Sequence, residues 1–419
     1  MSEGLFTRII ALDILQTIIR KKQNLDDSFE NKANDLPARD KAFIRMLITT
    51  TLRRMGQIDD ILKKLLTKKL PQNAQAIENI LRLAICQILF METADFAAVD
   101  TAVEMTHHYK KEAFSSLVNG VLRNVCRQKE KLLTTQDAAI LNTPQWLWTD
   151  WVKTYGKETT YQIALANLNE PSTYITCKKE ANVWAEKLNG ILTSTDSVQL
   201  PKNVYIPDLE GFKEGAWLVQ DAAAHLAVQA FNNDLNEKYV ADICAAPGGK
   251  TAGLIAKGAK VDAFDISKNR MERVKENLKR LNYTANLYVK DANDIDGNKI
   301  YDAILLDAPC SATGTIMRHP DLYFHRTQQD IEKLNAAQYR LLQTAHRLLK
   351  DDGELVYCTC SLQTQEGEDM IDKVSDLFQR QEIKNPCLKP FLTTKGDIRT
   401  FPHNQMDGFF ICLLKKRCK

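Results

Sequence analysis

One stretch near the middle of the chain decides its fold. It reads Asp242-Ile243-Cys244-Ala245-Ala246-Pro247-Gly248-Gly249-Lys250-Thr251 and continues an expected strand that begins at residue 238. A buried strand that ends in a turn of small residues and leads into a helix is typical of the first unit of a doubly wound α/β sheet. The two glycines let main-chain N–H groups approach a ligand closely. We therefore expect a Rossmann-like domain with a ligand site at this turn.

The sequence after residue 216 alternates between strand and helix patterns. Strands are expected at 238–243, 260–264, 285–289, 302–307 and 353–359, and helices near 250–257, 268–281, 328–350 and 365–380. This alternation predicts a parallel sheet covered by helices on both faces. Ligands of such sheets lie beyond the carboxyl ends of the strands, so the loops that follow the strands are the candidate site.

Carboxylates recur at these strand ends. Asp265 ends the second strand, 16 residues after Gly249, where an acid commonly binds the ribose hydroxyls of an adenosine. Asp291 follows the third strand, where an adenine amino group would be recognised. Each alone could be an ordinary solvated carboxylate. Together they favour a ligand that contains adenosine but needs no phosphate, and S-adenosyl-L-methionine is the obvious candidate.

Two thiols follow the last two expected strands. Cys310 stands in Asp307-Ala308-Pro309-Cys310-Ser311, and Cys360 stands in Thr359-Cys360-Ser361. A single buried cysteine is usually a small structural hydrophobe. Two that converge on one ligand crevice indicate covalent chemistry, because a thiolate is a strong nucleophile.

Two other functions remain open at this point. A phosphate-loop nucleotide hydrolase would share Gly249-Lys250-Thr251 and an acid such as Asp307, but the first glycine of its loop is replaced here by Cys244. A non-enzymatic RNA-binding factor with a silent enzyme fold would not need Cys310 and Cys360. Binding of labelled S-adenosylmethionine or ATP, and methyl transfer to bulk RNA, distinguish the three.

The N-terminal third has helical periodicity throughout. Helices are expected near 5–21, 38–53, 57–66, 74–91, 98–109 and 113–129. Residues 1–130 carry 20 Lys and Arg against 16 Asp and Glu, a slight excess that is weak support for a nucleic-acid partner. We expect three domains: a helical domain at 1–130, a linker with a small α+β module at 131–215, and the Rossmann-like domain at 216–419.

The composition indicates the class of protein and its cellular location. The chain of 419 residues has 44% hydrophobic and 26% charged residues, and no apolar run is long enough to span a bilayer. Its beginning does not have the pattern of a secretory signal. The ten cysteines include no C-x-x-C pair, so we expect reduced thiols, no metal site, no membrane association and a cytoplasmic location.

These motifs resemble the signature of the RNA 5-methylcytosine methyltransferases. The resemblance rests on the stretch 242–251, on Asp307 to Gly314 with Arg318-His319-Pro320-Asp321, on Thr359-Cys360-Ser361 and on Asp407-Gly408-Phe409-Phe410. The helical part, with Val118-Asn119-Gly120-Val121-Leu122-Arg123, is similar to NusB-type RNA-binding domains. The combination covers essentially the whole chain and is typical of bacterial members that act on small-subunit ribosomal RNA.

The resemblance implies a role for each matching residue. Cys360 would be the nucleophile that adds to carbon 6 of cytosine, Cys310 would assist release of the product, and Asp307 would lie between cofactor and base. The residues that would hold S-adenosyl-L-methionine are Cys244, Ala245, Ala246, Pro247, Gly248, Gly249, Lys250, Asp265, Asp291 and Asp307. The implied partner is small-subunit rRNA, as naked RNA or an early assembly intermediate, with no obligate protein partner.

Further expectations concern the surroundings of the nucleophile. Asp307 could relieve the charge that develops at N3 of the base if its carboxyl were protonated. Gln220 and Asp221 match another motif that lines the site. Where the family usually has Leu-Arg-Val-Asn, this chain has Tyr174 to Lys178, so an RNA contact of the missing arginine would move to Lys178 or Lys179.

Overall fold

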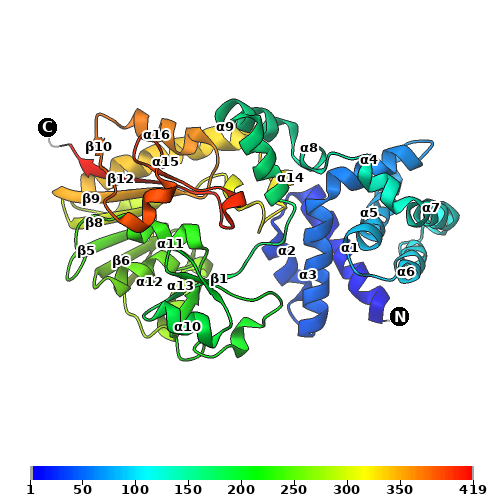
Figure 1. Cartoon of the computed structure of the whole chain (residues 1–419), viewed down its shortest axis with the longest axis horizontal. Coiled ribbons are helices and arrows are strands. Elements are labelled where there is room, and N and C mark those ends of the chain that lie inside the picture. Colours follow the sequence, from blue (N-terminus) through cyan, green and yellow to red (C-terminus); the bar gives the residue numbers. More distant parts are fainter. Residues whose placement is uncertain (1–2, 418–419) are drawn as a thin grey trace. The chain divides into compact units, whose positions relative to one another are not determined.

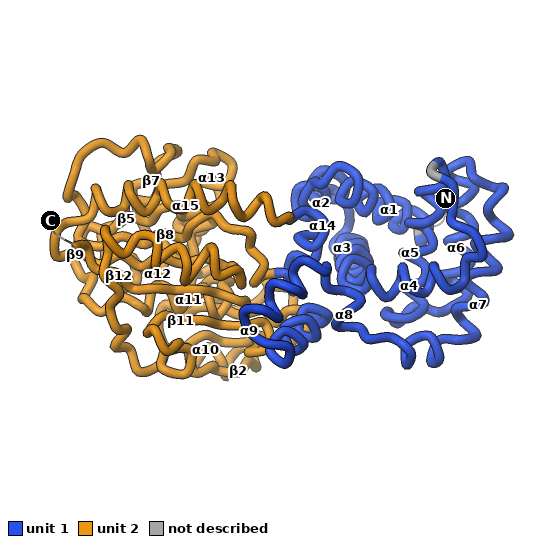
Figure 2. The backbone as a smooth tube through the Cα atoms, turned by 90° about the horizontal axis from the view of Figure 1, so that it is seen from above, with its two compact units in different colours: residues 1–170, 316–326 blue, residues 171–315, 327–419 orange. Residues whose placement is uncertain are grey.

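The chain forms two compact units in a computed structural model that describes residues 3–417. Unit 1 comprises the chain up to Glu170 together with Ile316–Arg326, and unit 2 comprises Pro171–Thr315 and Thr327–Lys419 (Figure 2). The units thus divide after residue 170, whereas the sequence placed domain limits at residues 130 and 215. The threefold domain division stays a prediction.

Unit 1 is helical. Its helices are α1 (Glu3–Lys21), α2 (Leu25–Ala33), α3 (Ala38–Arg53), α4 (Met55–Leu65), α5 (Gln75–Phe90), α6 (Asp95–His108), α7 (Ser115–Thr134), α8 (Ala138–Asn142), α9 (Gln145–Ala166) and α14 (Leu322–His325), with 3-10 turns at Gln72–Ala74 and Glu112–Phe114 (Figure 1). Apolar residues three and four apart, such as Leu12 and Leu15 on α1, are fully buried and build one core. Five of the six expected helices begin and end within three residues of the prediction and the sixth within five, and α2 was missed because few of its residues are apolar.

A segment that is distant in sequence completes unit 1. Residues 316–326 pack into it, with Ile316 fully buried and Phe324 against the helical core. The buried guanidinium of Arg53, on α3, donates to the Met317 carbonyl at 2.9 Å through one NH2 group and at 3.3 Å through Nε. The Leu25 amide donates to Asp321 Oδ2 at 2.9 Å. Unit 1 is therefore complete only when this later part of the chain is in place.

Unit 2 begins with a small antiparallel sheet in the order β2-β3-β1-β4. Its elements are β1 (Tyr174–Cys177), α10 (Ala181–Lys187), β2 (Ile191–Leu192), β3 (Ser197–Gln199), a 3-10 turn at Ile206–Asp208, and β4 (Trp217–Val219). Trp217 and Ile175 are fully buried between the sheet and α10. The expected small α+β module is present as a structure within this unit.

The main sheet of unit 2 has eight strands. Its strands are β5 (Tyr239–Ile243), β6 (Lys260–Asp265), β7 (Asn286–Val289), β8 (Tyr301–Asp307), β9 (Leu349–Thr359), β10 (Phe378–Arg380), β11 (Ile398–Arg399) and β12 (Phe410–Lys416). Neighbours follow the order β10-β12-β9-β8-β5-β6-β7, with β11 paired to β12. Strands β5 to β9 pair in parallel, as expected, but β10, β11 and β12 are antiparallel. The expected parallel sheet is therefore confirmed for its five strands, and the three antiparallel strands were missed.

Helices cover both faces of this sheet (Figure 1). They are α11 (Ala222–Gln229), α12 (Gly249–Ala256), α13 (Lys268–Arg280), α15 (Gln328–Leu348) and α16 (Glu368–Lys373), with 3-10 turns at Ala292–Asp294, Thr313–Thr315, Thr364–Glu366, Pro386–Phe391 and Pro402–Asn404. Successive strand residues point to opposite faces: Leu305 packs with α11 and α12, whereas Ile304 and Leu306 pack with α15. The expected helix 365–380 was too long, because β10 occupies its last residues.

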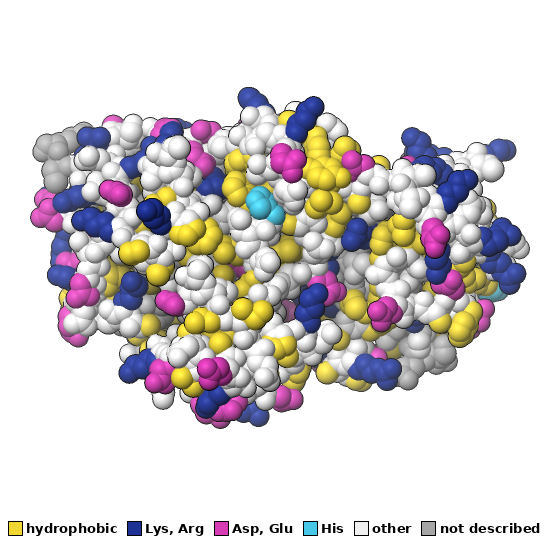
Figure 3. Space-filling model, viewed as in Figure 1, with side chains coloured by type: hydrophobic (Ala, Val, Ile, Leu, Met, Phe, Trp, Pro, Cys, Tyr) yellow, Lys and Arg dark blue, Asp and Glu magenta, His cyan; other side chains and the backbone are white. Residues whose placement is uncertain are grey.

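The surface is mixed in charge. Lys and Arg side chains alternate with Asp and Glu on the face shown in Figure 3. Among residues 3–417, no helix is long and apolar enough to cross a membrane. The same residues contain no cluster of three His, Cys, Asp or Glu side chains suited to a metal ion.

Candidate active site

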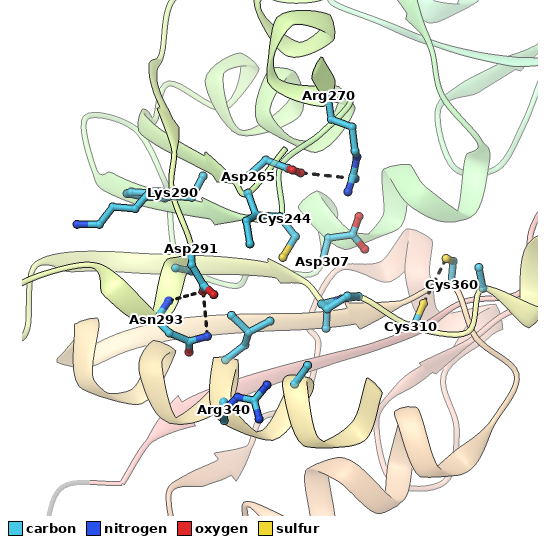
Figure 4. Close-up of a pocket in the computed structure, with 18 residues that line it drawn as sticks. Cys244, Asp265, Arg270, Lys290, Asp291, Asn293, Asp307, Cys310, Arg340 and Cys360 are labelled. Carbon is cyan, nitrogen blue, oxygen red and sulfur yellow. Dashed lines mark hydrogen bonds and ion pairs between the residues drawn. The ribbon is translucent and has the colours of Figure 1, made fainter. Parts of the chain in front are cut away.

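A cavity of ≈ 390 Å³ lies at the carboxyl ends of the parallel strands. Six residues predicted from the sequence line it: Cys244, Asp265, Asp291, Asp307, Cys310 and Cys360 (Figure 4). The parallel register brings them together, because Ile243 pairs with both Phe264 and Leu306, and Asp307 pairs with Cys358. The strand order turns at β5, between β6 and β8, where open α/β sheets bind their ligands.

Asp265 is fixed at one end of the cavity. Its side chain is almost fully buried and accepts the Ser267 amide at 2.9 Å and the Ala246 amide at 3.3 Å. Arg270, on α13, lies 3.5 Å from Asp265 Oδ2 (Figure 4). These contacts hold a carboxylate at the cavity wall, as recognition of ribose hydroxyls requires.

Asp291 also lines this cavity. Its Oδ1 accepts both the main-chain and the side-chain amide of Asn293, each at 2.9 Å. Phe264, which also lines the cavity, stacks on Tyr288 with ring centroids 4.9 Å apart. A flat apolar wall beside two carboxylates, in a cavity of the usual size for a cofactor, suits a ligand that contains adenosine.

The two predicted thiols lie side by side. Cys310 Sγ and Cys360 Sγ are 3.4 Å apart, and the Gly314 amide, in the loop after Cys310, donates to the Cys360 carbonyl at 3.0 Å. The hydrogen bond with Cys360, burial, and the nearby charge of Glu366 together raise the pKa of Cys310. At neutral pH, Cys310 therefore retains its proton.

Lys250 does not line this cavity. Its ammonium forms an ion pair with Asp307 Oδ2 at 2.7 Å, and only 10% of its side chain is exposed. Burial alone would lower the pKa of Lys250, but the Asp307 carboxylate raises it above the ordinary value. No motif in the sequence indicated this ion pair, which places a positive charge at the end of β8.

Most of the other residues in the predicted cofactor loop line a different cavity. Ala245, Ala246, Pro247, Gly249 and Lys250 line a second cavity of ≈ 350 Å³, and Asp307 lines both cavities. Gly248 lines neither. Gly248 is the N-cap residue directly before α12 and has a φ of 98°, and a β-carbon there would lie 3.0 Å from a side-chain carbon of Val274. Only glycine fits that turn without strain.

The remaining thiols near the site are unsuited to attack. Burial, with Asp307 and Asp265 nearby, raises the pKa of Cys244 to about 12. Cys358 is fully buried, does not line the cavity, and lies 3.5 Å from Asp307 Oδ1. Burial raises its pKa well above the ordinary value, and Asp307 raises it further.

Other expected residues lie around the second cavity. Gln220 lines it, and its Oε1 accepts the Thr176 hydroxyl at 3.0 Å. Asp221 caps α11 by accepting the Ala223 amide at 2.9 Å. The Lys178 ammonium donates to the Leu281 carbonyl and lies 4.3 Å from the ring centre of Tyr283. Lys178 is thus engaged within the unit.

Sequence reasoning missed several residues of the site. Arg270, Lys290 and Arg340 also line the first cavity (Figure 4). Arg340 comes from α15, and nothing in its helical pattern distinguished it from a surface arginine. Glu366 lies buried under the two thiol loops and belongs to a short turn with no recognisable motif.

Comparison with known proteins gave matches along the chain. Residues 229–415 match a family model described as 16S rRNA methyltransferase RsmB/F, and residues 6–127 match the NusB family. The ribosomal RNA small subunit methyltransferase B of Cronobacter sakazakii is 32% identical over 88% of this chain and 90% of that protein. The protein of the same name from Escherichia coli O1:K1 is 31% identical over 98% of both.

Solved structures share the fold. The crystal structure of PH0851 covers 99% of both chains with a TM-score of 0.77 and 23% identity. A methyltransferase homolog from Pyrococcus horikoshii matches 69% of this chain and 98% of its own with a TM-score of 0.55 and 26% identity. NSun6 from Pyrococcus horikoshii with SFG matches 66% of this chain and 99% of its own, with a TM-score of 0.57 and 21% identity.

Proposed function

Since this chain belongs to the RsmB/F family of S-adenosylmethionine-dependent rRNA methyltransferases, we propose that it methylates carbon 5 of a cytosine in small-subunit 16S rRNA through a covalent bond from Cys360. The observation that carries this proposal is the pair of thiols, 3.4 Å apart, at the wall of a cavity suited to adenosine. Nucleotide hydrolysis does not require a pair of thiols at the site.

The family assignment confirms the predicted fold class and the predicted cofactor. The chain combines a NusB-like helical part with a Rossmann-like methyltransferase part. S-adenosylmethionine supplies an electrophilic methyl group when it is bound. We assign Asp265 to the ribose and Asp291 to the adenine, because these carboxylates line the same cavity beside Phe264.

Cys360 activates the base. Carbon 5 of cytosine is a weak nucleophile, and addition of a thiolate to carbon 6 moves the electron pair of the 5,6 double bond toward carbon 5 and N3. Cys360 first loses its proton to solvent. Because Cys310 retains its own proton, it can donate a hydrogen bond to Cys360 Sγ and stabilise the resulting thiolate. Carbon 5 then has the electron pair that takes up the methyl group.

Cys310 acts after methylation. The hydrogen bond and charge of Cys360 help to keep Cys310 protonated, and both are lost once Cys360 is bonded to carbon 6. Cys310 then ionises to solvent and takes the proton from carbon 5. The electron pair of that C–H bond restores the 5,6 double bond, and Cys360 leaves as the thiolate.

Lys250 and Asp307 stabilise the charged ring. The expected role of Asp307 as a proton donor to N3 needs a protonated carboxyl, but its neighbour is the Lys250 ammonium at 2.7 Å. We therefore assign the hydrogen bond to the ring to Lys250, and the orientation of that ammonium to Asp307. A fixed donor of this kind acts most strongly where charge develops during the reaction.

The target base must leave its stack to reach Cys360, which costs a few kcal/mol. Contacts elsewhere on the RNA must offset that cost, and we assign them to the NusB-like helices and the small sheet of unit 2. Naked rRNA or an early assembly intermediate offers the accessible single-stranded segment that this requires.

Adduct trapping with thiol variants tests the mechanism. Cys310→Ala should accumulate a heat-stable covalent complex with labelled small-subunit rRNA, seen as a shifted band on a denaturing gel. Cys360→Ala and the double variant should form no complex and no 5-methylcytosine. Cys412→Ala, which removes a fully buried thiol on β12, is the matched control and should behave as the wild type.

Two results would refute the assignment. A complex that forms with Cys360→Ala but not with Cys310→Ala reverses the two roles. Methyl transfer that survives in both variants makes the thiols structural and removes the covalent mechanism.

A further inference from the structure

One buried carboxylate, that of Glu366, connects the two thiol loops. It lies at the end of a short 3-10 turn, and the residue is 0% exposed. The Ser311 amide donates to its two oxygens at 2.9 and 3.1 Å, and the Ser311 hydroxyl also donates to Oε2. The Ser361 hydroxyl donates at 2.6 Å, and Gln338 donates from α15 at 3.2 Å.

Both serines follow a thiol directly. Ser311 comes after Cys310, and Ser361 comes after Cys360. The two serine hydroxyls are 3.1 Å apart, so one carboxylate holds both loops at the same point. The main chain of the Cys310 loop and the side chain of the Cys360 loop are thereby fixed to one rigid group.

Stability alone does not account for a charge in this place. A buried carboxylate has lost its hydration, and a well-packed apolar replacement is often equally stable. The main chain of Glu366 is also anchored without its side chain, because its carbonyl accepts the Tyr357 hydroxyl at 2.9 Å and the Thr359 hydroxyl at 3.2 Å. The carboxylate is therefore an added constraint on the loops.

We infer that Glu366 is a positioning residue that fixes the separation of the Cys310 and Cys360 sulfur atoms. Its importance for methyl transfer rests on the proposed function, but the separation itself can be measured without RNA. A displacement of about 1 Å between reacting groups can slow a reaction by on the order of 100-fold. A rigid acceptor under both loops prevents such displacement.

Glu366 also acts on Cys310 through its charge. After the hydrogen bond with Cys360 and burial, the Glu366 carboxylate is a further cause of the raised pKa of Cys310. Replacing it with a neutral amide removes a nearby negative charge and should lower that pKa. A residue that served only to stabilise the fold would not shift the titration of one particular thiol.

The test compares Glu366→Gln with Glu354→Gln. Glu354 is a buried glutamate on β9 that accepts the Asn232 and Asn233 amides at 3.1 and 3.0 Å. Its replacement also neutralises a buried carboxylate, but one that contacts neither thiol loop, so Glu354→Gln is the matched control for stability. Diamide oxidises the thiol pair without RNA: two thiols lose two protons and two electrons to the N=N bond, which becomes a hydrazine. Peptide mass spectrometry follows the Cys310–Cys360 disulfide and, separately, alkylation of each thiol by iodoacetamide.

The measured quantity is the rate of disulfide formation divided by the rate at which iodoacetamide alkylates the same thiols. We expect this ratio to be roughly 10- to 100-fold lower in Glu366→Gln than in the wild type. The alkylation profile of Cys310 should shift to lower pH. Methyl transfer should lose kcat while the Kd for S-adenosylmethionine is unchanged. Glu354→Gln should leave all of these at wild-type values. Ser361→Ala removes one of the hydrogen bonds to Glu366 and should cause a smaller change in the same direction if Glu366→Gln does not fold.

A normalised disulfide rate and a Cys310 pH profile that match the wild type in these variants would overturn the inference. Failure of the proposed function has a different signature. If Cys360→Ala keeps full methyl transfer, the covalent mechanism is wrong, whereas the disulfide and alkylation results still decide whether Glu366 positions the thiols.

Discussion

Asp242, directly below the cofactor loop, should make the stability of unit 2 depend on pH. The residue is fully buried on β5, and its Oδ2 accepts the Thr251 hydroxyl at 2.6 Å. Burial raises its pKa from 3.8 to about 7, and the neighbouring Asp307 and Asp265 add to the shift. The perturbation is Asp242→Asn, which keeps the shape of the side chain and removes its titration.

Proton linkage determines the direction in which the free energy of unfolding changes with pH. Between pH 4 and 7 the unfolded chain has lost the Asp242 proton while the folded chain keeps it, so rising pH favours unfolding. Each pH unit in this interval corresponds to about 1.4 kcal/mol. The stabilisation is complete below pH 4 and is lost as pH rises through about 7. Between pH 5 and 8.5 the loss is about 2 to 3 kcal/mol, because pH 5 lies about two units below the folded-state pKa and each unit contributes about 1.4 kcal/mol.

Urea titrations at pH 5, 6, 7 and 8.5 measure this effect as the difference in free energy of unfolding between Asp242→Asn and the wild type. The variant should gain about 2 to 3 kcal/mol relative to the wild type across the series. A difference that stays constant with pH, or that changes in favour of the wild type as pH rises, would refute the reasoning.

Two further variants test other parts of the chain. Asp265→Ala should weaken S-adenosylmethionine binding by on the order of 1 to 3 kcal/mol, because a buried charged acceptor is lost; calorimetry that finds unchanged affinity removes Asp265 from the site. Arg53→Met leaves the Met317 carbonyl without its donor, so amide exchange of residues 316–326 should show a local stability lower by about 1 to 3 kcal/mol. Arg45, on the same helix as Arg53, forms an exposed ion pair with Asp26 of α2, so Arg45→Met should cost at most about 1 kcal/mol. An equal effect of both variants would contradict the anchoring role of Arg53.

Most strands that position the site could be predicted, because each has a recognisable pattern within its own few residues. Strands β5 to β8 are short apolar runs followed by an acid or a small-residue turn, and their observed bounds agree with prediction to within one residue. The carboxyl ends of parallel strands lie at one edge, so placing Asp265, Asp291, Asp307 and Cys360 near one another needed only the strand pattern.

The rest depends on contacts that no local pattern encodes. The antiparallel strand β12 is apolar on both faces and lies far along the chain from its partner β9, so its pairing was missed. The Lys250–Asp307 ion pair and the Glu366 contacts join residues from different loops.

Because residues 316–326 form part of the helical unit, this unit cannot be completed early during synthesis on the ribosome. The Leu25 amide and its acceptor on Asp321 are separated by 296 residues. At ordinary elongation rates, roughly 15 to 60 s of synthesis pass between them. During that interval, the newly made helices leave exposed the apolar residues that later contact Phe324, and the Arg53 guanidinium lacks its carbonyl acceptor. Nascent chains in this state can be bound by chaperones, and the helical unit is completed only after four of the eight strands of the main sheet have been synthesised.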